Sequence, residues 1–538
     1  MSIATNLPGT EIRTRYWEWA TAALLAALLL FVLLGYNEHG ISNDEIVQRT
    51  YGELLLQFYS SGFADRRAFS YINLYYYGGL FDMLAAGLQQ HLPMDVWDLR
   101  HLLTGLCGLS GMVATALLAR LVTTARGAFL SVLLLCLTGA WIGTLFTHTK
   151  DIPFAAAMTW SVYAITRIVP ALPRPGWRLV LGTGLAIGCA LGMRVGGLFA
   201  VLYLGLAVCV GLAADIDSPR VYAQRLLAIV PRMAVLVLVA GIVMAIAWPW
   251  SVMGWTNLFD AATKFSHFSF DMATLVDGQL IQVGDVPATY LSQYLLVRLP
   301  ELLLFGLLLA GVLLCVRAAQ LRLTHEESAH ELPLLLAATF PIMFSLLTAP
   351  ALYNGVRHFT FLLPPLAVVA AMGLEATLTW LGRSRLTFGL FSLLILAGVA
   401  DPAITLARLH PYEQLAYNHV TGGTRGAEDR WESDYWGDSL RAAVELLNAR
   451  LRSEIGDAAG SYTVAFCAEP LQAEAYLDPR LHVTRDWPSA DFFVTATHIN
   501  CDKALKGDVI GSVERMGLAF AVVKDRRNLV GHERRVHK

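Results

Sequence analysis

The chain contains 538 residues, of which 56% are hydrophobic and only 15% are charged, and its formal net charge is −2. This balance, with a mean hydropathy of +0.52, is typical of a polytopic membrane protein and argues against a soluble chain of this length. The near-neutral charge also argues against the basic surface by which proteins bind nucleic acids.

Apolar stretches long enough to cross a hydrocarbon core of about 30 Å recur along residues 1–402. The first stretch lacks a small-residue cleavage site, so we expect it to remain as an anchor rather than to be removed as a signal peptide. About eleven membrane-spanning helices are expected, near residues 17–36, 100–122, 128–147, 153–170, 178–195, 197–214, 230–249, 298–318, 333–350, 359–382 and 387–402.

The short loops between these stretches indicate an orientation, because arginine and lysine are retained on the cytoplasmic side. An odd number of spans then places residues 403–538 on the opposite, periplasmic or extracytoplasmic, face of the inner (plasma) membrane. The basic residues assigned to the cytoplasmic side are Arg13, Arg15, Arg120, Arg126, Arg167, Arg174, Arg178, Arg220, Arg225, Arg232, Arg317, Arg322, Arg383 and Arg385.

Charged clusters lie just past the ends of apolar stretches on the predicted outer side. Charges at such depths are costly, so they are candidates for function by default. Two structural alternatives remain open: the arginines snorkel to the interface, or the aspartate of the second cluster begins a helix. The clusters are Asp44-Glu45 in the first outer loop (37–99), Lys150-Asp151, Arg194, and Arg357-His358.

Two loops on the same face are long. Residues 51–92 are expected to form amphipathic helices that lie at the membrane surface. The loop at 250–297, which includes His267, is long enough to fold over a site, as long loops often do. The aromatic run Tyr75-Tyr76-Tyr77 fits either an interfacial anchor or stacking on a sugar.

Residues 403–538 have the composition of a soluble domain, and we expect a small α/β fold. Short strands are predicted at 462–467, 481–484, 491–495 and 518–523, and helices at 436–455 and 468–477. Cys467 and Cys501 are the only cysteines of this domain, and an oxidising exterior would permit a bridge between them. Sequence does not supply the geometry, so the bridge is left open.

These motifs resemble the GT-C membrane glycosyltransferases, and more narrowly the protein O-mannosyltransferase and lipid A aminoarabinose transferase (family 39-like) group. The resemblance covers the layout of nearly the whole chain, whereas its specific motifs occupy a few dozen residues. They are Asp44-Glu45, the segment Lys150-Asp151-Ile152-Pro153-Phe154, the segment from Tyr353 to His358 followed by Pro364-Pro365, and His410-Pro411-Tyr412, Tyr417-Asn418, Gly422-Gly423 and Asp434-Tyr435-Trp436-Gly437.

The resemblance implies a membrane catalytic domain at 1–402 that transfers a monosaccharide from a polyprenyl-phosphate donor to an acceptor hydroxyl, with inversion. Asp44 matches the acidic position of the first-loop motif and is the expected general base, with Glu45 beside it. Fixed cations would stabilise the leaving phosphate, and the candidates are Lys150, Arg194, Arg357 and His358. Asp151, His267 and Tyr353 are possible supports, and Asp434, Tyr435 and Trp436 serve either acceptor binding or domain packing.

The lipid-linked donor and the bilayer are the expected partners, with a glycan, lipid or protein as acceptor. No metal is required by this chemistry, although the paired acids Asp44 and Asp151 could recruit a divalent ion. One alternative is a transporter or flippase of a lipid-linked or anionic solute, which an intramembrane Arg194 would suit. Another is a scaffold that keeps the membrane fold and binds partners through its outer domain.

Overall fold

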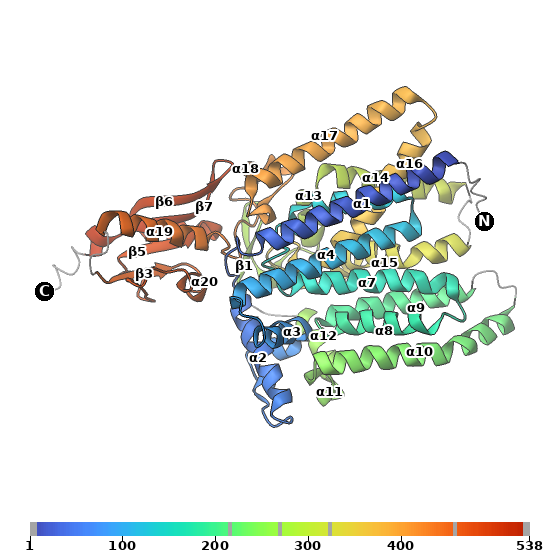
Figure 1. The fold of residues 1–538 in the computed structure, drawn as a ribbon, viewed down its shortest axis with the longest axis horizontal. Coiled ribbons are helices and arrows are strands. Elements are labelled where there is room, and N and C mark those ends of the chain that lie inside the picture. Colours follow the sequence, from blue (N-terminus) through green and yellow to red (C-terminus); the bar gives the residue numbers. More distant parts are fainter. Residues whose placement is uncertain (1–7, 214–217, 267–271, 321–324, 456–459, 531–538) are drawn as a thin grey trace.

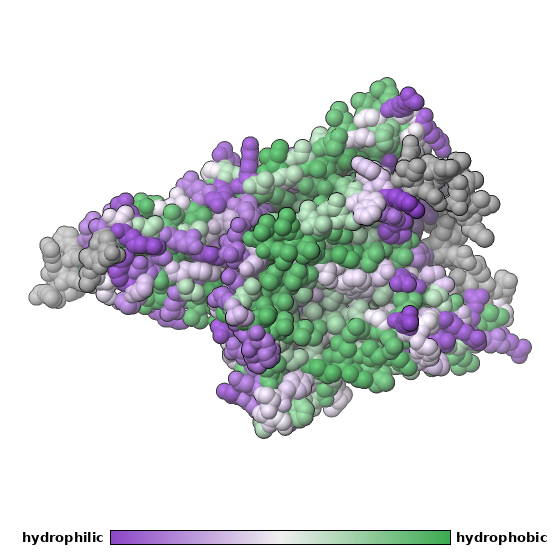
Figure 2. Space-filling model, in the orientation of Figure 1, coloured by the Kyte–Doolittle hydropathy of each residue, from purple (hydrophilic) through white to green (hydrophobic). Residues whose placement is uncertain are grey.

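A computed structural model describes residues 8–213, 218–266, 272–320, 325–455 and 460–530. A bundle of long helices carries a small α/β domain at one end, and the described N-terminal end of α1 lies at the other (Figure 1). Apolar residues cover the sides of the bundle, whereas polar residues cover the small domain and reappear at the opposite end (Figure 2). The fold is therefore that of a polytopic helical membrane protein with a soluble terminal domain, as the sequence predicts.

Nine helices in the described ranges are long and apolar enough to span a membrane. They coincide with nine of the predicted stretches, and the 3-10 turn η6 (Arg357–Leu362) leads into one of them. They are α1 (Pro8–Gly35), α4 (Val96–Val122), α7 (Asp151–Ile168), α9 (Leu198–Ala213), α10 (Pro219–Ala247), α14 (Glu301–Ala319), α15 (His325–Thr348), α16 (Leu363–Leu381) and α17 (Arg385–Leu409).

The remaining two predicted spans hold shorter helices, α5 (Ala125–Cys136) and α8 (Trp177–Leu191). The chain after α5 turns through the four-residue helix α6 (Gly139–Ile142) instead of continuing as one span to residue 147. A side chain at Gly143 would lie 1.9 Å from the backbone nitrogen of Gln414, so the break lets the segment after α17 dock closely.

The first outer loop forms α2 (Glu45–Ser60), the 3-10 turns η1 (Arg67–Phe69) and η2 (Leu74–Tyr76), and α3 (Leu80–Gln89). Helix α2 runs across the direction of the bundle, next to α3 (Figure 1). Gly52 permits this packing, because a side chain there would meet the backbone oxygen of Asp82 at 2.3 Å. The helices expected at 51–92 are thus present, and their location at the membrane surface stays a prediction.

The described parts of the second long outer loop, 250–266 and 272–297, also contain regular elements. It contains α11 (Trp250–Met253), α12 (Asn257–Ser266), strands β1 (Ala273–Val276) and β2 (Gln279–Gln282), the turn η5 (Val283–Asp285) and α13 (Tyr290–Arg298). Asp277 and Gly278 both have positive φ, as a two-residue turn between antiparallel strands requires. The amide of Gly278 donates to the carbonyl oxygen of Arg430 at 2.9 Å, which ties this hairpin to the outer domain.

Helix α17 continues through Pro402 to Leu409, so the soluble part begins seven residues later than the predicted boundary. The chain then makes the short turns η7 (Glu413–Leu415), η8 (His419–Thr421) and α18 (Gly423–Gly426) against the bundle. The segment His410-Pro411-Tyr412 thus begins at the end of the last helix and not within a free-standing domain.

The outer domain is a five-stranded mixed sheet in the order β4-β3-β5-β7-β6, packed with helix α19 (Leu440–Ile455). Four strands lie where the sequence predicts them, while β6 was not predicted and α20 (Leu471–Glu474) is shorter than expected. A disulfide joins Cys467 to Cys501, which resolves the question left open above. The strands are β3 (Tyr462–Phe466), β4 (Leu481–Val483), β5 (Phe492–Ala496), β6 (Asp508–Arg515) and β7 (Leu518–Asp525).

Candidate active site

Four separate elements bring the predicted charged residues together at the outer end of the bundle. Asp44 occupies the N-cap position of α2, and Asp151 is the first residue of α7. Arg194 has an extended backbone immediately before the 3-10 turn η4 (Val195–Gly197). Arg357 begins the turn η6 ahead of α16. Helix ends and breaks thus supply every group, because mid-helix positions would point into apolar packing or lipid.

The four side chains form a chain of alternating charge. Arg357 Nη2 lies 2.7 Å from Asp44 Oδ2, and Arg357 Nε lies 3.6 Å from Asp151 Oδ2. Arg194 Nη2 completes the chain, 2.6 Å from Asp151 Oδ1. The Arg357 and Asp151 side chains are 6% and 3% exposed, whereas that of Asp44 is 34% exposed. Pairing offsets the cost of burying these charges, and Asp44 is the accessible end.

This arrangement bears on the two structural alternatives, snorkelling of the arginines and capping of a helix by Asp151. Arg194 and Arg357 pair with buried carboxylates, so they do not merely snorkel to the interface. Lys150 and not Asp151 occupies the N-cap position of α7. The carboxylate of Asp151 is therefore committed to the two arginines.

Lys150 lies beside the ion chain with its ammonium group over an aromatic ring. Its Nζ is 3.2 Å from the ring centroid of Tyr77, and Arg194 Cζ is 5.8 Å from the same centroid. Burial and the neighbouring Arg194 charge lower the pKa of Lys150 to about 7, although the carboxylates of Asp44 and Asp151 act in the opposite direction. Lys150 therefore changes charge close to neutral pH.

The outer domain covers the arginine at the centre of the chain. Arg357 Cζ lies 4.3 Å from the ring centroid of Trp436 and 5.2 Å from that of Tyr353. The His148 ring lies 5.1 Å from Trp436, and burial lowers the pKa of His148 well below its usual range. Trp436 thus packs the outer domain onto the site, which is one of the two roles predicted for its segment.

The other residues of that segment differ in environment. Both carboxylate oxygens of Asp434 accept backbone N–H groups, from Asp438 at 3.0 Å and from Ser439 at 2.8 Å, so Asp434 organises the turn before α19. Tyr435 is half-buried, and desolvation raises the pKa of its phenol above the usual value. Its ring lies 6.2 Å from His148.

Glu45 belongs to a different contact set from its neighbour Asp44. The side chain is fully buried, and its Oε1 accepts from the backbone N–H and the hydroxyl of Ser42 at 2.9 and 2.8 Å. His101 Nε2 lies 3.2 Å from the same oxygen. These contacts stabilise the turn that presents Asp44, so the geometry gives Glu45 a positioning part in place of a direct catalytic one.

An apolar cavity of about 320 Å³ reaches from this charged site toward the bundle. Arg194, Tyr77, Tyr353 and His358 line its polar part. The His358 ring lies 4.7 Å from that of Tyr353. The apolar lining residues include Phe154, Leu198, Phe199, Phe344, Leu352 and Phe361.

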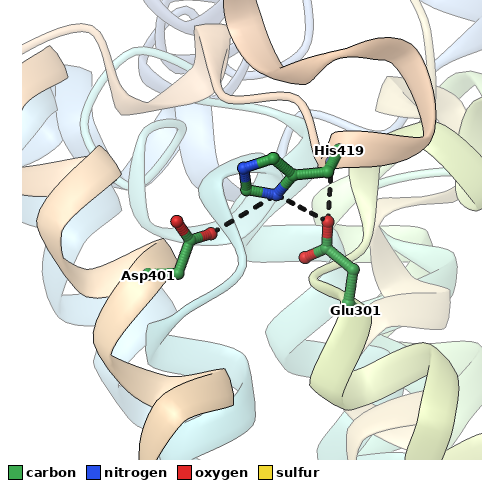
Figure 3. Close-up of side chains that lie close together, drawn as sticks. All are labelled: Glu301, Asp401 and His419. Atoms are coloured by element: carbon green, nitrogen blue, oxygen red, sulfur yellow. Dashed lines mark hydrogen bonds and ion pairs between the residues drawn. The ribbon is translucent and has the colours of Figure 1, made fainter.

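His267, another predicted support, lies outside the described residues. Among the residues that the structure describes, one group of two acids and a histidine has the spacing of metal ligands (Figure 3). His419 Nδ1 lies 3.0 Å from Glu301 Oε1 and 3.6 Å from Asp401 Oδ2. All three side chains are at least 44% exposed, and they join η8 to the first residue of α14 and to the interior of α17. Asp44 and Asp151, the two acids considered for a metal in the sequence analysis, both contact the guanidinium of Arg357. That cation occupies the position between them.

Sequence reasoning assigned no site role to Tyr77 or to the phenylalanines of the cavity. Tyr77 belonged to an aromatic run that fitted either an interfacial anchor or stacking on a sugar, and nothing in the sequence relates it to Lys150. Phe154 is the last residue of the Lys150–Phe154 motif, which was the available signal. The other phenylalanines come from distant helices, so only the folded chain brings them together.

Comparison with known proteins agrees with the family resemblance. Residues 50–265 match the family model described as dolichyl-phosphate-mannose-protein mannosyltransferase. No curated protein sequence matches the chain significantly. The match agrees with the resemblance to protein O-mannosyltransferases that the motifs indicate.

Several solved structures are similar in layout. ArnT from Cupriavidus metallidurans bound to undecaprenyl phosphate is 13% identical, with 94% of this chain and 97% of that chain covered and a TM-score of 0.46. The oligosaccharyltransferase AglB from Archaeoglobus fulgidus, in complex with an inhibitory peptide and a dolichol-phosphate, is 13% identical, with coverage of 90% and 69% and a TM-score of 0.46. The Pmt1-Pmt2 complex of S. cerevisiae bound to the sugar donor is 16% identical, with coverage of 49% and 39% and a TM-score of 0.34.

Proposed function

We propose that this protein is a membrane glycosyltransferase that moves a monosaccharide from a polyprenyl-phosphate carrier to an acceptor hydroxyl at the outer face of the membrane. The observation that carries the proposal is that a buried chain of charges adjoins an apolar cavity. An accessible carboxylate, Asp44, lies at one end of a buried chain of charges, and Arg194 at the other end lines an apolar cavity.

The cavity suits the donor. An isoprenoid chain needs an apolar, membrane-facing environment, and the phenylalanine-rich lining supplies one. The phosphate diester needs cations at the polar end, where Arg194 and, at neutral pH and below, Lys150 are available. Negative charge grows on this phosphate as it leaves, so preplaced cations stabilise the transition state more than the bound donor.

The reaction then requires one base. The acceptor oxygen forms a bond to the anomeric carbon, and the bond from that carbon to the phosphate oxygen breaks with its electron pair on the phosphate. The acceptor proton passes to the Asp44 carboxylate. Arg357 fixes the orientation of that carboxylate through the 2.7 Å contact. Displacement from the opposite side of the sugar inverts the anomeric configuration.

The test is turnover of a labelled polyprenyl-phosphate sugar by the full chain in lipid nanodiscs. Asp44→Asn keeps the size of the side chain but removes the base, so we expect turnover to fall by about 10²–10⁴-fold with the unfolding temperature little changed. Asp65→Asn is the matched control, because Asp65 is a carboxylate of the same outer loop that also pairs with an arginine, Arg67.

Asp65→Asn should retain the activity of the unmodified chain. Near-normal turnover by Asp44→Asn would contradict the assignment of the base. Movement of intact donor across the bilayer without breakage of its sugar bond would instead favour the transporter alternative.

A further inference from the structure

A second cavity, of about 380 Å³, lies in the outer domain and takes no part in the chemistry described above. It is enclosed by the β1–β2 hairpin, the segment 415–433, the 3-10 turn η9 (His498–Lys503) and strand β7. Its floor is buried, whereas Leu280, Asp429, Asn500 and Lys503 at its rim are exposed. Cavities that bind small ligands commonly have volumes of about 300–1,000 Å³.

Two buried polar atoms on the lining have no hydrogen-bond partner among the described residues. They are the indole nitrogen Nε1 of Trp431, a residue that is 5% exposed, and Nδ1 of His498. The other ring nitrogen of His498, Nε2, lies 3.3 Å from Oε2 of the buried Glu432. Buried polar atoms are nearly always satisfied in native proteins, so two unpaired atoms around one cavity indicate a hydrogen-bonding ligand.

The protein holds these groups in place by other contacts. The second oxygen of Glu432 accepts from the Leu275 amide at 3.0 Å and from the Thr274 hydroxyl, so the carboxylate is anchored to the hairpin. The Trp431 ring lies 5.0 Å from that of Tyr294. The disulfide of Cys501 fixes the turn that carries His498. Groups that are rigid and still unpaired are pre-arranged for a ligand.

The backbone around the rim is also unusual. Asp429, Ile499 and Asn500 all adopt positive φ, which for a β-branched isoleucine is a strained conformation. Strain of this kind gathers at binding and catalytic sites, where the surrounding structure maintains it.

The lining chemistry selects the class of ligand. Four acidic residues line the cavity against one lysine, so an anionic ligand is disfavoured: Glu428, Asp429, Glu432 and Asp502 against Lys503. The unpaired atoms combine an N–H donor on Trp431 with Nδ1 of His498, which accepts when Nε2 carries the proton facing Glu432, and a hydroxyl group both donates and accepts. The edge strands β4 and β6 of the five-stranded sheet do not line the cavity, so a peptide in the cavity cannot extend that sheet.

We propose that this cavity binds a neutral, hydroxyl-rich carbohydrate that forms part of the acceptor. The inference rests on the proposed transfer chemistry for its acceptor role. Tyr435 links the two sites, because its ring lies 6.5 Å from that of His498 and 6.2 Å from that of His148. The neighbouring Trp436 covers Arg357, the partner of Asp44. A glycan held at Trp431 and His498 would thus extend past Tyr435 toward the base.

Saturation-transfer NMR on the full chain in nanodiscs tests this inference with defined probes. The neutral probes are maltotriose, cellotriose, mannotriose and chitotriose, and the anionic probe is trigalacturonate. Trp431→Phe removes the indole N–H but keeps an aromatic ring, and Glu432→Gln removes the charge at nearly constant shape. Matched controls are Trp487→Phe and Glu469→Gln, which alter the same residue types outside the cavity lining.

We expect at least one neutral trisaccharide to bind the unmodified chain and both controls, and its affinity to fall about tenfold or more in each cavity variant. Glu432→Gln and Trp431→Phe should leave the unfolding temperature near that of their controls. The inference is overturned if no neutral probe binds the unmodified chain, if both cavity variants bind as tightly as the controls, or if trigalacturonate binds best.

Hydrolysis of the lipid-linked donor, measured on the same samples, separates this inference from the proposed function. Sugar binding lost in the cavity variants, with donor turnover retained, supports a separate acceptor site. Sugar binding by a chain that never turns over a lipid-linked donor would retain the carbohydrate site but overturn its acceptor role.

Discussion

At the scale of single residues, Arg357 is the group on which the candidate site depends. It contacts the accessible Asp44 and the buried Asp151, and it lies beneath the ring of Trp436. A planar guanidinium can serve two carboxylates and an aromatic face at once, whereas an ammonium group is a point charge. The same residue therefore orients the proposed base and contacts the outer domain through Trp436.

Lys150 leads to a prediction about pH. Its pKa of about 7 means that the ammonium is charged below that pH and neutral above it. The phosphodiester of the donor keeps its charge through the neutral range. The donor KM should therefore be lowest below pH ~7 and rise by up to about tenfold per pH unit above it. Lys150→Arg should remove this rise, because arginine stays charged.

The measurement is the KM for the lipid-linked donor between acid and mildly alkaline pH, with acceptor held constant. The KM for acceptor should change little over the same range in both proteins. A Lys150→Arg variant that keeps the full pH dependence of the donor KM would place the phosphate elsewhere.

The residues of the site were only partly predictable from sequence. Asp44, Lys150, Arg194 and Arg357 stood out because each is a charge beside an apolar stretch. The opposite environments of Asp44 and Glu45 could not be predicted, since adjacent positions at a helix start diverge only when Ser42 and His101 are in place. The cavity residues Trp431, Glu432 and His498 were missed, because they approach one another only through the packing of loops.

At the scale of elements, the break between α8 and α9 is what brings Arg194 to the site. A side chain at Gly78 would lie 2.0 Å from the backbone oxygen of Gly192, so the first outer loop packs directly against the end of α8. The chain then needs only Met193, Arg194 and the turn η4 to enter α9. A longer connection between α8 and α9 would let Arg194 reach water, and its ion pair with Asp151 would be lost.

The apolar cavity gives a prediction at this scale. Ala351 lines it between α15 and η6, so Ala351→Trp should fill part of the space proposed for the isoprenoid chain. We expect the KM for a long polyprenyl donor to rise about tenfold, with a smaller effect on a farnesyl-phosphate sugar. Ala318→Trp is the control, because Ala318 is exposed in the last turn of α14.

Competition between long and short donors on the two variants provides the measurement. Equal effects of Ala351→Trp on both chain lengths would show that the cavity does not hold the distal part of the lipid.

Element prediction from sequence succeeded where periodicity or length is strong and failed where packing decides. The long spans were located because apolar runs of that length have few alternatives. The predicted span 128–147 is broken because Gly143 approaches the backbone of Gln414, a contact that spans much of the chain. Strand β6 escaped prediction because its residues are mostly exposed or half-buried, with Gly511 in its interior.

At the scale of the whole molecule, the polar ends and apolar sides in Figure 2 determine how the protein sits in a bilayer. The loop between α7 and α8, which carries Arg174, and the loop between α16 and α17, which carries Arg383, lie at the end of the bundle opposite the outer domain (Figure 1). Under the positive-inside rule, this separation favours an outer domain outside the cytoplasm. The disulfide of the outer domain also fits an oxidising compartment. Its 34-residue separation implies a contribution of about 3–4 kcal/mol by loop closure.

Fusion of alkaline phosphatase tests this orientation, since the enzyme is active only where its own disulfides form. A fusion after the last residue should be active. A fusion after Arg383, between α16 and α17, should be inactive although expressed to a similar level. The reverse pattern would place the outer domain and the candidate site on the cytoplasmic side.

The cover that Trp436 provides has a consequence for the biosynthesis of the protein. The nine candidate spanning helices among the described residues all end at or before Leu409, so the membrane domain is translated before the outer domain. Until the outer domain follows, Arg357 lacks its aromatic cover, and the carbohydrate cavity lacks the strand and turn that close it. The last part of the chain to be made thus completes the site, and an unfinished chain in the membrane would not consume lipid carriers.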